Sequence, residues 1–385
     1  MSNGVSVRGT VAEGFEGVRE EFSAVLAEEL HQPGAQLAAY LHGRQVVDLW
    51  AGDGLAGDSL TGVFSVTKGA AHLVVALLVQ DGVLDLDREV SHYWPEFAAE
   101  GKGALTLREL LAHRSGVIGV EGGFSPEELA DDRLLAERLA GRRPYWEPGT
   151  AYGYHGLVIG ALTGEVVRRA TGRSIQEWFE QRIRAPYGLD FYLGLPEALE
   201  PRYLDVQPAL PTPEQLAEFE ASRATPNALR TVAFNLNATP PTDLVEFANS
   251  RAVRALGQAS AGGVANARGV AAMYAAAISE LDGRAPLLRP ETIAEFAHLH
   301  TKGPDLVVTA QDHFGLGFEM QGVRYPFLGP DAFGHAGASG SQAFADPRSG
   351  VAYAYTRRRF AFPPSGGSPE NDRLAAAVLR AADGR

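Results

Sequence analysis

The sequence predicts an α/β plus all-α protein, in which strands gather near both ends of the chain and helices fill the middle. Strand patterns occur before residue 51 and after residue 313, whereas helical patterns separated by proline-rich turns dominate residues 85 to 260. Strands that are distant in sequence can share one sheet, so we expect a discontinuous α/β domain, residues 1–84 and 260–385. Residues 85–259 then form an inserted helical domain, and the cleft between the two parts is where a site is expected.

The N-terminal part is predicted to contain two helices and a hairpin. Val11–Leu30 carries apolar residues at helical spacing with acidic residues between them. Gln36–Leu41 and Gln45–Trp50 flank a His-Gly pair and predict two strands joined by a tight turn. A second helix is expected from Ser65 to Gln80, where an Asp-Gly pair ends it.

The middle of the chain is predicted to be helical with one irregular excursion. Thr106 and Glu109 fit a capping box and mark the start of a helix. Further helices are expected over Val158–Ala170 and Ser174–Arg184. The stretch Glu200–Thr242 contains seven prolines, so we expect irregular chain there with one short helix near residues 214–222.

The C-terminal part returns to strands. An alanine-rich helix is predicted over Ala267–Leu281, followed by strands at Phe314–Met320, Gln342–Asp346 and Val351–Arg357. A helix over Asp372–Ala382 closes the chain.

Composition excludes several classes of function. The net charge is 34 − 47 = −13, which gives a nucleic-acid partner no electrostatic footprint. The chain has no cysteine, so thiolate nucleophiles, disulfides and cysteine-ligated metals are excluded, and we expect no cofactor and no metal. No apolar stretch is long enough for a membrane span and the N-terminus lacks a signal pattern, so a cytoplasmic location is expected. The oligomeric state does not follow from the sequence.

One short motif carries chemistry. Ser65-Val66-Thr67-Lys68 is an S-x-x-K sequence at the start of a strongly apolar helix, in a chain with only three lysines. Residues three apart share a helix face, so the Lys68 amine is expected beside the Ser65 hydroxyl. If burial keeps that lysine neutral, it can accept the serine proton and create a nucleophile without a histidine. The competing Ser-His-Asp mechanism finds no support, because no serine lies in a G-x-S-x-G sequence.

Two further motifs follow in order. Tyr154-His155-Gly156 lies 89 residues after Ser65, and His335-Ala336-Gly337 precedes a predicted strand. Together with flanking sequences such as Leu110–Gly116, the three motifs resemble the serine β-lactamase/penicillin-binding superfamily. The resemblance is to its class C-like branch, which includes family VIII carboxylesterases, and extends from about residue 36 to 360. It implies a β-lactamase-like fold with a mostly antiparallel sheet flanked by helices.

The resemblance also implies roles for individual residues. Ser65 would be the acylated nucleophile, Lys68 its general base, and Tyr154 a proton shuttle to the leaving group. A cation would be needed to favour the Tyr154 phenolate near neutral pH, and Lys68 is the candidate. The backbone N–H groups of Ser65 and Ala338 would form the oxyanion hole. His335 and Gly337 would line the substrate site on a strand that continues to Ala338.

The departures from the family pattern favour an ester as substrate. The Y-x-N asparagine is replaced by Gly156, and the K-T-G lysine by His335, so the groups that hold a β-lactam amide and carboxylate are missing. The sequence therefore predicts a carboxylesterase acting on a small-molecule ester. The alternatives are a β-lactamase, a D-aminopeptidase or amidase, or an acyltransferase of the same fold. A non-catalytic binding or scaffold homologue is the alternative of another class.

Overall fold

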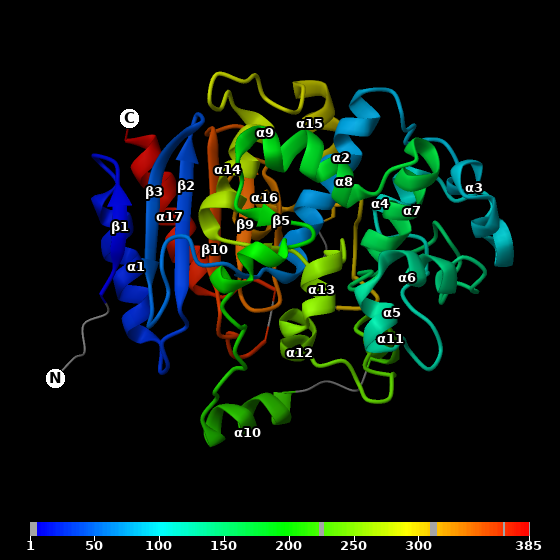
Figure 1. The fold of residues 1–385 in the computed structure, drawn as a ribbon, viewed down its shortest axis with the longest axis horizontal. Coiled ribbons are helices and arrows are strands. Elements are labelled where there is room, and N and C mark those ends of the chain that lie inside the picture. The colour runs from blue at the N-terminus through cyan, green and yellow to red at the C-terminus, as the bar shows by residue number, and fades with distance from the viewer. Residues whose placement is uncertain (1–5, 223–226, 309–313, 365, 385) are drawn as a thin grey trace.

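Figure 1 shows a computed structural model of the protein, which describes residues 6–222, 227–308, 314–364 and 366–384. Within those ranges the main sheet has the order β1-β3-β2-β10-β9-β8-β7, and all neighbouring strands are antiparallel. Its strands are β1 (Arg8–Val11), β2 (Ala35–Leu41), β3 (Arg44–Ala51), β7 (Glu319–Met320), β8 (Phe333–Ala336), β9 (Gln342–Asp346) and β10 (Val351–Arg357). Because β2 pairs with β10 along its whole length, the two ends of the chain share one sheet. This confirms the predicted α/β class.

Helices cover both faces of the sheet. Helices α1 (Glu16–Glu28) and α17 (Glu370–Asp383) pack on one face, together with Leu37 and Ala39 of β2. Helices α2 (Thr67–Gln80) and α14 (Ala267–Ile278) share the other core with the alternate residues Ala38 and Tyr40. Since successive side chains of a strand point to opposite faces, both faces of β2 are buried, which explains why its sequence is apolar except at Gln36.

The remaining helices lie between residues 90 and 324, and those before residue 172 are on the far side of α2 from β1, as Figure 1 shows. They are α3 (Val90–Tyr93), α4 (Leu107–Leu111), α5 (Pro126–Ala130), α6 (Asp132–Leu139), α7 (Ile159–Thr171), α8 (Ile175–Phe179), α9 (Ala185–Tyr187), α10 (Pro213–Ser222), α11 (Ala228–Ala233), α12 (Leu244–Asn249), α13 (Arg251–Leu256), α15 (Pro290–Phe296) and α16 (Gln321–Arg324). A small sheet, β4 (Thr61–Gly62), β6 (Val264–Ala265) and β5 (Phe191–Tyr192), joins segments from three parts of the chain. The division at residues 84 and 260 stays a prediction.

Several local predictions are confirmed. The β2–β3 turn has positive φ at His42 (49°) and Gly43 (76°), as the tight turns of hairpins require. Thr106 and Glu109 form the predicted capping box at the start of α4. Strands β9 and β10 have the predicted bounds, and a helix occupies residues 213–222 in the irregular stretch, of which residues 223–226 lie outside the described ranges.

Other local predictions are wrong. Val11 does not begin a helix: it ends β1 and pairs with Val47, because an edge of the sheet outweighs local helical spacing. The predicted strand Phe314–Met320 shrinks to Glu319–Met320, since Gly317 has φ 79° and a side chain there would collide with the His72 ring. The strand predicted to continue to Ala338 ends at Ala336, and the chain turns there. In the part of the chain that the structure describes, no helix is both long and apolar enough to cross a membrane.

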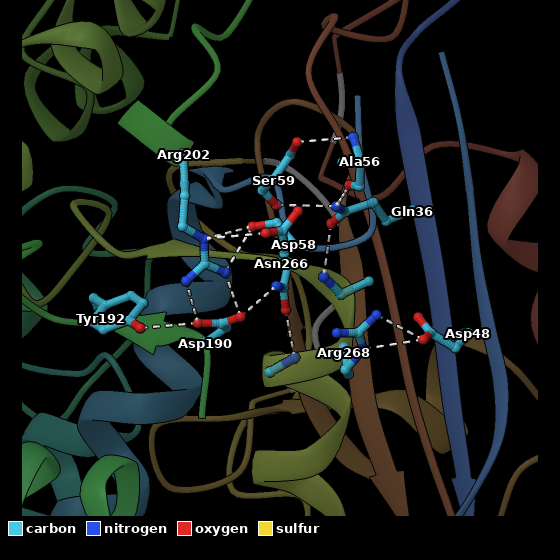
Figure 2. Close-up of polar contacts among 12 residues, drawn as sticks. Gln36, Asp48, Ala56, Asp58, Ser59, Asp190, Tyr192, Arg202, Asn266 and Arg268 are labelled. Carbon is cyan, nitrogen blue, oxygen red and sulfur yellow. Dashed lines mark hydrogen bonds and ion pairs between the residues drawn. The ribbon is translucent and has the colours of Figure 1, made fainter. Parts of the chain in front are cut away.

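A polar network fixes the start of α14 against the rest of the fold, as Figure 2 shows. Asp190 accepts hydrogen bonds from Arg202, Tyr192 and Asn266, and the Asn266 side chain caps α14 by accepting from the Gly269 N–H. The network holds the end of the 257–266 connection, which carries Gly263 to the start of α2. There the Gly263 carbonyl accepts from the Val63 N–H, and its own N–H donates to the Thr67 hydroxyl.

Candidate active site

Ser65 lies in a 3₁₀ turn, Phe64–Val66, that runs directly into α2. Phe64 has φ 50°, a left-handed conformation that is unusual for a bulky residue and is found where surrounding structure imposes it. Its ring packs edge-on against Phe360 at 5.1 Å between centroids. The turn therefore holds Ser65 at a defined place just before α2. Ser65 is partly exposed there.

Lys68 lies beside Ser65, as the three-residue spacing predicts. Its Nζ is 3.0 Å from Ser65 Oγ, 2.7 Å from the Gly156 carbonyl oxygen and 2.8 Å from the Ser260 carbonyl oxygen. The residue is fully buried on a helix that is buried from Thr67 to Leu78. Burial lowers the pKa of Lys68 to about 7, although the negative charge of Glu319 opposes that shift.

The three acceptors around Nζ impose a direction on a neutral Lys68. A carbonyl oxygen can only accept hydrogen bonds, so Gly156 and Ser260 take the two N–H groups of the neutral amine. The nitrogen lone pair is then left for the third direction, toward Ser65 Oγ. In this arrangement a neutral Lys68 is oriented to accept the Ser65 proton.

Tyr154 completes the polar contacts of Ser65, because its hydroxyl donates to Ser65 Oγ at 2.7 Å. Its ring stacks on Phe314 at 5.7 Å, and its backbone N–H donates to Asp305. Burial raises the pKa of Tyr154 well above its ordinary value. Desolvation of the phenolate, together with the negative charges of Glu319 and Asp305, favours the protonated phenol in the resting site, and the expectation that Lys68 stabilises a phenolate stays a prediction.

Gly337 and Ala338 follow β8 and lie against the Ser65 turn. A Cβ atom on Gly337 would come within 2.6 Å of the Val63 carbonyl oxygen, so only glycine permits this approach. Ala338 packs in the same apolar cluster as Phe64 and Phe360. The structure thus brings the two segments that carry the predicted oxyanion-hole N–H groups side by side.

His335 lies on β8 and is only 1% exposed. Its Nδ1 is 3.3 Å from a carboxylate oxygen of Glu319 on β7, and its ring centroid is 5.9 Å from that of Tyr154. The other Glu319 oxygen accepts from the Ala336 N–H at 3.0 Å. The histidine in the K-T-G position is therefore paired with a carboxylate, and its role in substrate binding stays a prediction.

Three other histidines are buried around the site and are held neutral. His72, one turn after Lys68 on α2, and His155, beside Tyr154, are both fully buried. Burial lowers the pKa of His72 to about 3 and that of His155 to about 4, and it also holds the pKa of His113 well below its usual range. The His155 ring contacts the Ser115 hydroxyl and the Gly153 carbonyl, away from Ser65.

Some groups at the site could not be predicted from motifs. The carbonyls of Gly156 and Ser260 contact Lys68 through backbone atoms, which leave no mark on residue type. Glu319 is an isolated acidic residue in the sequence, and only the β7–β8 pairing places it beside His335. Within the described residues, no group of three or more histidine, aspartate or glutamate side chains is arranged to hold a metal ion.

Comparisons with known proteins show the family of the chain. The Beta-lactamase family model matches residues 20–377. Esterase/beta-lactamase LipL of Mycobacterium tuberculosis is 30% identical over 345 residues, which cover 86% of this chain and 78% of LipL.

Solved structures are similar over nearly the whole chain. EstA from Arthrobacter nitroguajacolicus Rue61a has a TM-score of 0.89 at 43% identity, covering 97% of this chain and 98% of EstA. A family VIII carboxylesterase has a TM-score of 0.86 at 32% identity, covering 98% of this chain and all of that one. With its antiparallel sheet, its flanking helices and a family model matched from residue 20 to residue 377, this chain belongs to the beta-lactamase family.

Proposed function

We propose that this protein is a carboxylesterase of the class C-like branch, which hydrolyses small-molecule esters through an acyl-enzyme on Ser65. The observation that carries the proposal is the double contact of Ser65 Oγ, 3.0 Å from Lys68 Nζ and 2.7 Å from the Tyr154 hydroxyl. A serine between a lysine of lowered pKa and a protonated phenol has both a base and an acid within hydrogen-bond distance. The names of LipL, EstA and the family VIII carboxylesterase support the ester as substrate class.

The acylation step follows from the protonation states. Neutral Lys68 takes the Ser65 proton while Oγ bonds to the ester carbonyl carbon. The carbonyl oxygen becomes an oxyanion between the N–H groups of Ser65 and Ala338, where a preorganised donor contributes about 100- to 1,000-fold in turnover. The C–O bond to the alcohol then breaks, and the departing alkoxide takes the Tyr154 hydroxyl proton, which the Lys68 ammonium replaces.

Deacylation uses Lys68 again as the base, with water in place of the Ser65 hydroxyl. Lys68, now neutral again, accepts a proton from a water molecule that attacks the acyl carbon. The tetrahedral intermediate collapses, the bond to Ser65 Oγ breaks, and the serine recovers a proton from the Lys68 ammonium. The products are the free carboxylic acid and an enzyme in its starting state.

The charges at the site favour an uncharged acyl group. His335 stands where the K-T-G pattern of the family has a lysine, and it is paired with Glu319, so it offers an anionic substrate no free cation. An ester without a carboxylate does not need such a cation.

Replacement of the nucleophile tests the proposal. Ser65→Ala removes the attacking oxygen, so hydrolysis of p-nitrophenyl butyrate is expected to fall by at least about 1,000-fold. Intact-mass measurement after incubation with a fluorophosphonate is expected to show one adduct on the native chain and none on Ser65→Ala. Ester hydrolysis that survives in Ser65→Ala would refute the proposed function.

β-Lactam hydrolysis is the second candidate, because LipL is named an esterase/beta-lactamase. The missing asparagine at Gly156 and the missing lysine at His335 argue against efficient turnover. A chromogenic cephalosporin is therefore expected to react with a lower kcat/KM than p-nitrophenyl acetate or butyrate. The reverse order would make the protein primarily a β-lactamase.

A further inference from the structure

The orientation of Lys68 depends on two backbone carbonyls that are far apart in sequence. The importance of this orientation rests on the proposed function, in which neutral Lys68 is the base. Gly156 and Ser260 accept from Nζ at 2.7 and 2.8 Å. Gly156 precedes α7, whereas Ser260 lies in the connection between α13 and β6. If either carbonyl moves, an N–H of neutral Lys68 is released and the lone pair no longer has a single direction. Something must therefore hold the two segments together.

The Gln258 side chain bridges these two segments. Its amide nitrogen donates to the Leu157 carbonyl at 2.6 Å, one residue after Gly156. Its amide oxygen accepts from the Ser260 N–H at 3.1 Å and from the Ala261 N–H at 2.7 Å. Gln258 is fully buried, so these bonds form away from competing water.

The rest of the Ser260 segment is also tightly positioned. The Ser260 hydroxyl accepts from the Gly160 N–H at 2.8 Å, near the start of α7. A Cβ atom on Gly160 would lie 2.4 Å from the Ala259 carbonyl carbon, so this approach to α7 needs a glycine. On the other side, Asp132 accepts from the Ala259 N–H at 2.8 Å. These contacts position the segment along α7, and the Gln258 side chain connects it to Leu157, the residue that follows Gly156.

We propose that Gln258 is a positioning residue for the general base: its carboxamide holds the Gly156 and Ser260 carbonyls where they take both N–H groups of neutral Lys68 and direct its lone pair at Ser65. Gln258 does not touch Ser65 or Lys68 through its side-chain contacts, which go to Leu157, Ser260 and Ala261. It acts on proton abstraction and leaves the surface that meets the ester unchanged. Its loss therefore affects kcat and not KM.

The chain offers a matched control in Gln36 on β2. This side chain is also buried, and its amide nitrogen donates to the Ala56 and Ser59 carbonyls while its oxygen accepts from the Ala267 N–H (Figure 2). It thus makes the same kind of backbone bridge, but to segments that do not carry the acceptors of Lys68. Gln36→Met and Gln258→Met both keep the side-chain length and remove buried hydrogen bonds to backbone groups, and Gln36→Met also removes the bond that Gln36 accepts from the Thr356 hydroxyl.

The test compares these two variants in the full-length protein. Gln258→Met is expected to lower kcat for p-nitrophenyl butyrate by about 10- to 100-fold, the size of effect that misplacing a reacting group by about 1 Å produces. KM is expected to stay within about twofold, and the rate constant for fluorophosphonate modification of Ser65 to fall in parallel with kcat. Gln36→Met is expected to lose a similar amount of stability in urea unfolding, with kcat within about twofold of the native value.

Each outcome decides the inference. A kcat for Gln258→Met that matches that of Gln36→Met, or a defect confined to KM, would overturn it. If Gln258→Met does not fold, Gln258→Glu keeps the shape and the two accepted bonds but, when ionised, cannot donate to Leu157, and kcat is expected to fall as well. Ser65→Ala separates the two levels: an active Ser65→Ala refutes the proposed function, whereas an inactive Ser65→Ala beside an unimpaired Gln258→Met refutes only this inference.

Discussion

Lys68 is a buried amine with backbone carbonyls as two of its three acceptors, and this explains why it can serve as a base. A carboxylate in that place would stabilise the ammonium, whereas carbonyl dipoles stabilise it less and burial destabilises it. The outcome is a lysine whose pKa falls to about 7. The carboxylate of Glu319, which is paired with His335, tempers that shift without reversing it.

A pH profile of kcat/KM checks the charge state of Lys68. Because the neutral amine is the base, its fraction grows as pH rises through the Lys68 pKa of about 7. We expect kcat/KM for p-nitrophenyl butyrate to rise about tenfold per pH unit below pH 6 and to level off above pH 8. Lys68→Arg stays charged throughout and is expected to lose at least about 100-fold. A flat profile between pH 5 and 8 would contradict this assignment.

Glu319→Gln tests the charge beside His335. Glu319 raises the pKa of Lys68, so removing its charge is expected to move the acid limb of kcat/KM to lower pH. His72 and His113 also interact electrostatically with Lys68, and burial holds both of them neutral. Glu214→Gln, on the exposed helix α10, is the control and is expected to leave the profile unchanged. An acid limb that stays in place in Glu319→Gln would show that this carboxylate does not act on Lys68.

At the scale of elements, the join between the 3₁₀ turn and α2 is what makes Ser65 and Lys68 neighbours. The sequence predicts one helix from Ser65, and the structure instead starts α2 at Thr67 after the turn. The i, i+3 relation survives because both conformations place residues three apart on one side. The local pattern was therefore sufficient for the Ser65–Lys68 pair even though the predicted start of the helix was two residues early.

Thr106→Ala tests an element whose prediction is confirmed. The Thr106 side chain accepts from the Glu109 N–H and completes the capping box of α4. Its loss leaves a donor of the first turn unsatisfied and is expected to lower the free energy of unfolding by about 1 kcal/mol. Urea unfolding measures the change, and kcat is expected to remain native because α4 contributes no group to Ser65. A loss below about 0.3 kcal/mol would mean that water replaces the cap.

At the scale of the whole molecule, the two ends of the chain meet in one sheet whose far edge approaches Ser65. Strand β10 pairs with β2, and β8 brings His335, Gly337 and Ala338 to the nucleophile. The site thus forms only when segments about 270 positions apart in the sequence pack against each other. Folding the α/β part is a condition for assembling the site.

Acid unfolding provides a test at this scale. His72 is neutral in the folded state because burial lowers its pKa to about 3, whereas in the unfolded chain it protonates near 6.5. The unfolded state binds more protons between these values, so stability rises with pH there and is lost as pH falls below about 6.5. Each such histidine contributes about 1.4 kcal/mol per pH unit, and His155 and His113 act in the same direction.

The His72→Leu variant removes the contribution of His72 to the pH dependence of the free energy of unfolding. We expect the dependence of unfolding free energy on pH, measured in urea between pH 6 and pH 4, to be shallower than native by about 1.4 kcal/mol per unit. His31 is exposed, and the control variant His31→Gln is expected to keep the native slope. Equal slopes in His72→Leu and the native protein would mean that His72 is already protonated when folded.

The sequence by itself determined the α/β class, the longest helices and strands, and the identity of Ser65, Lys68 and Tyr154 as candidates. Those features depend on periodicity and short spacings, which local chain geometry preserves. Only the tertiary structure decided that Lys68 faces two carbonyls, that Gln258 bridges them, and that Glu319 pairs with His335. The reason is physical: a backbone carbonyl is the same in every residue, and its position near a distant side chain is set by packing and strand pairing and by no local pattern.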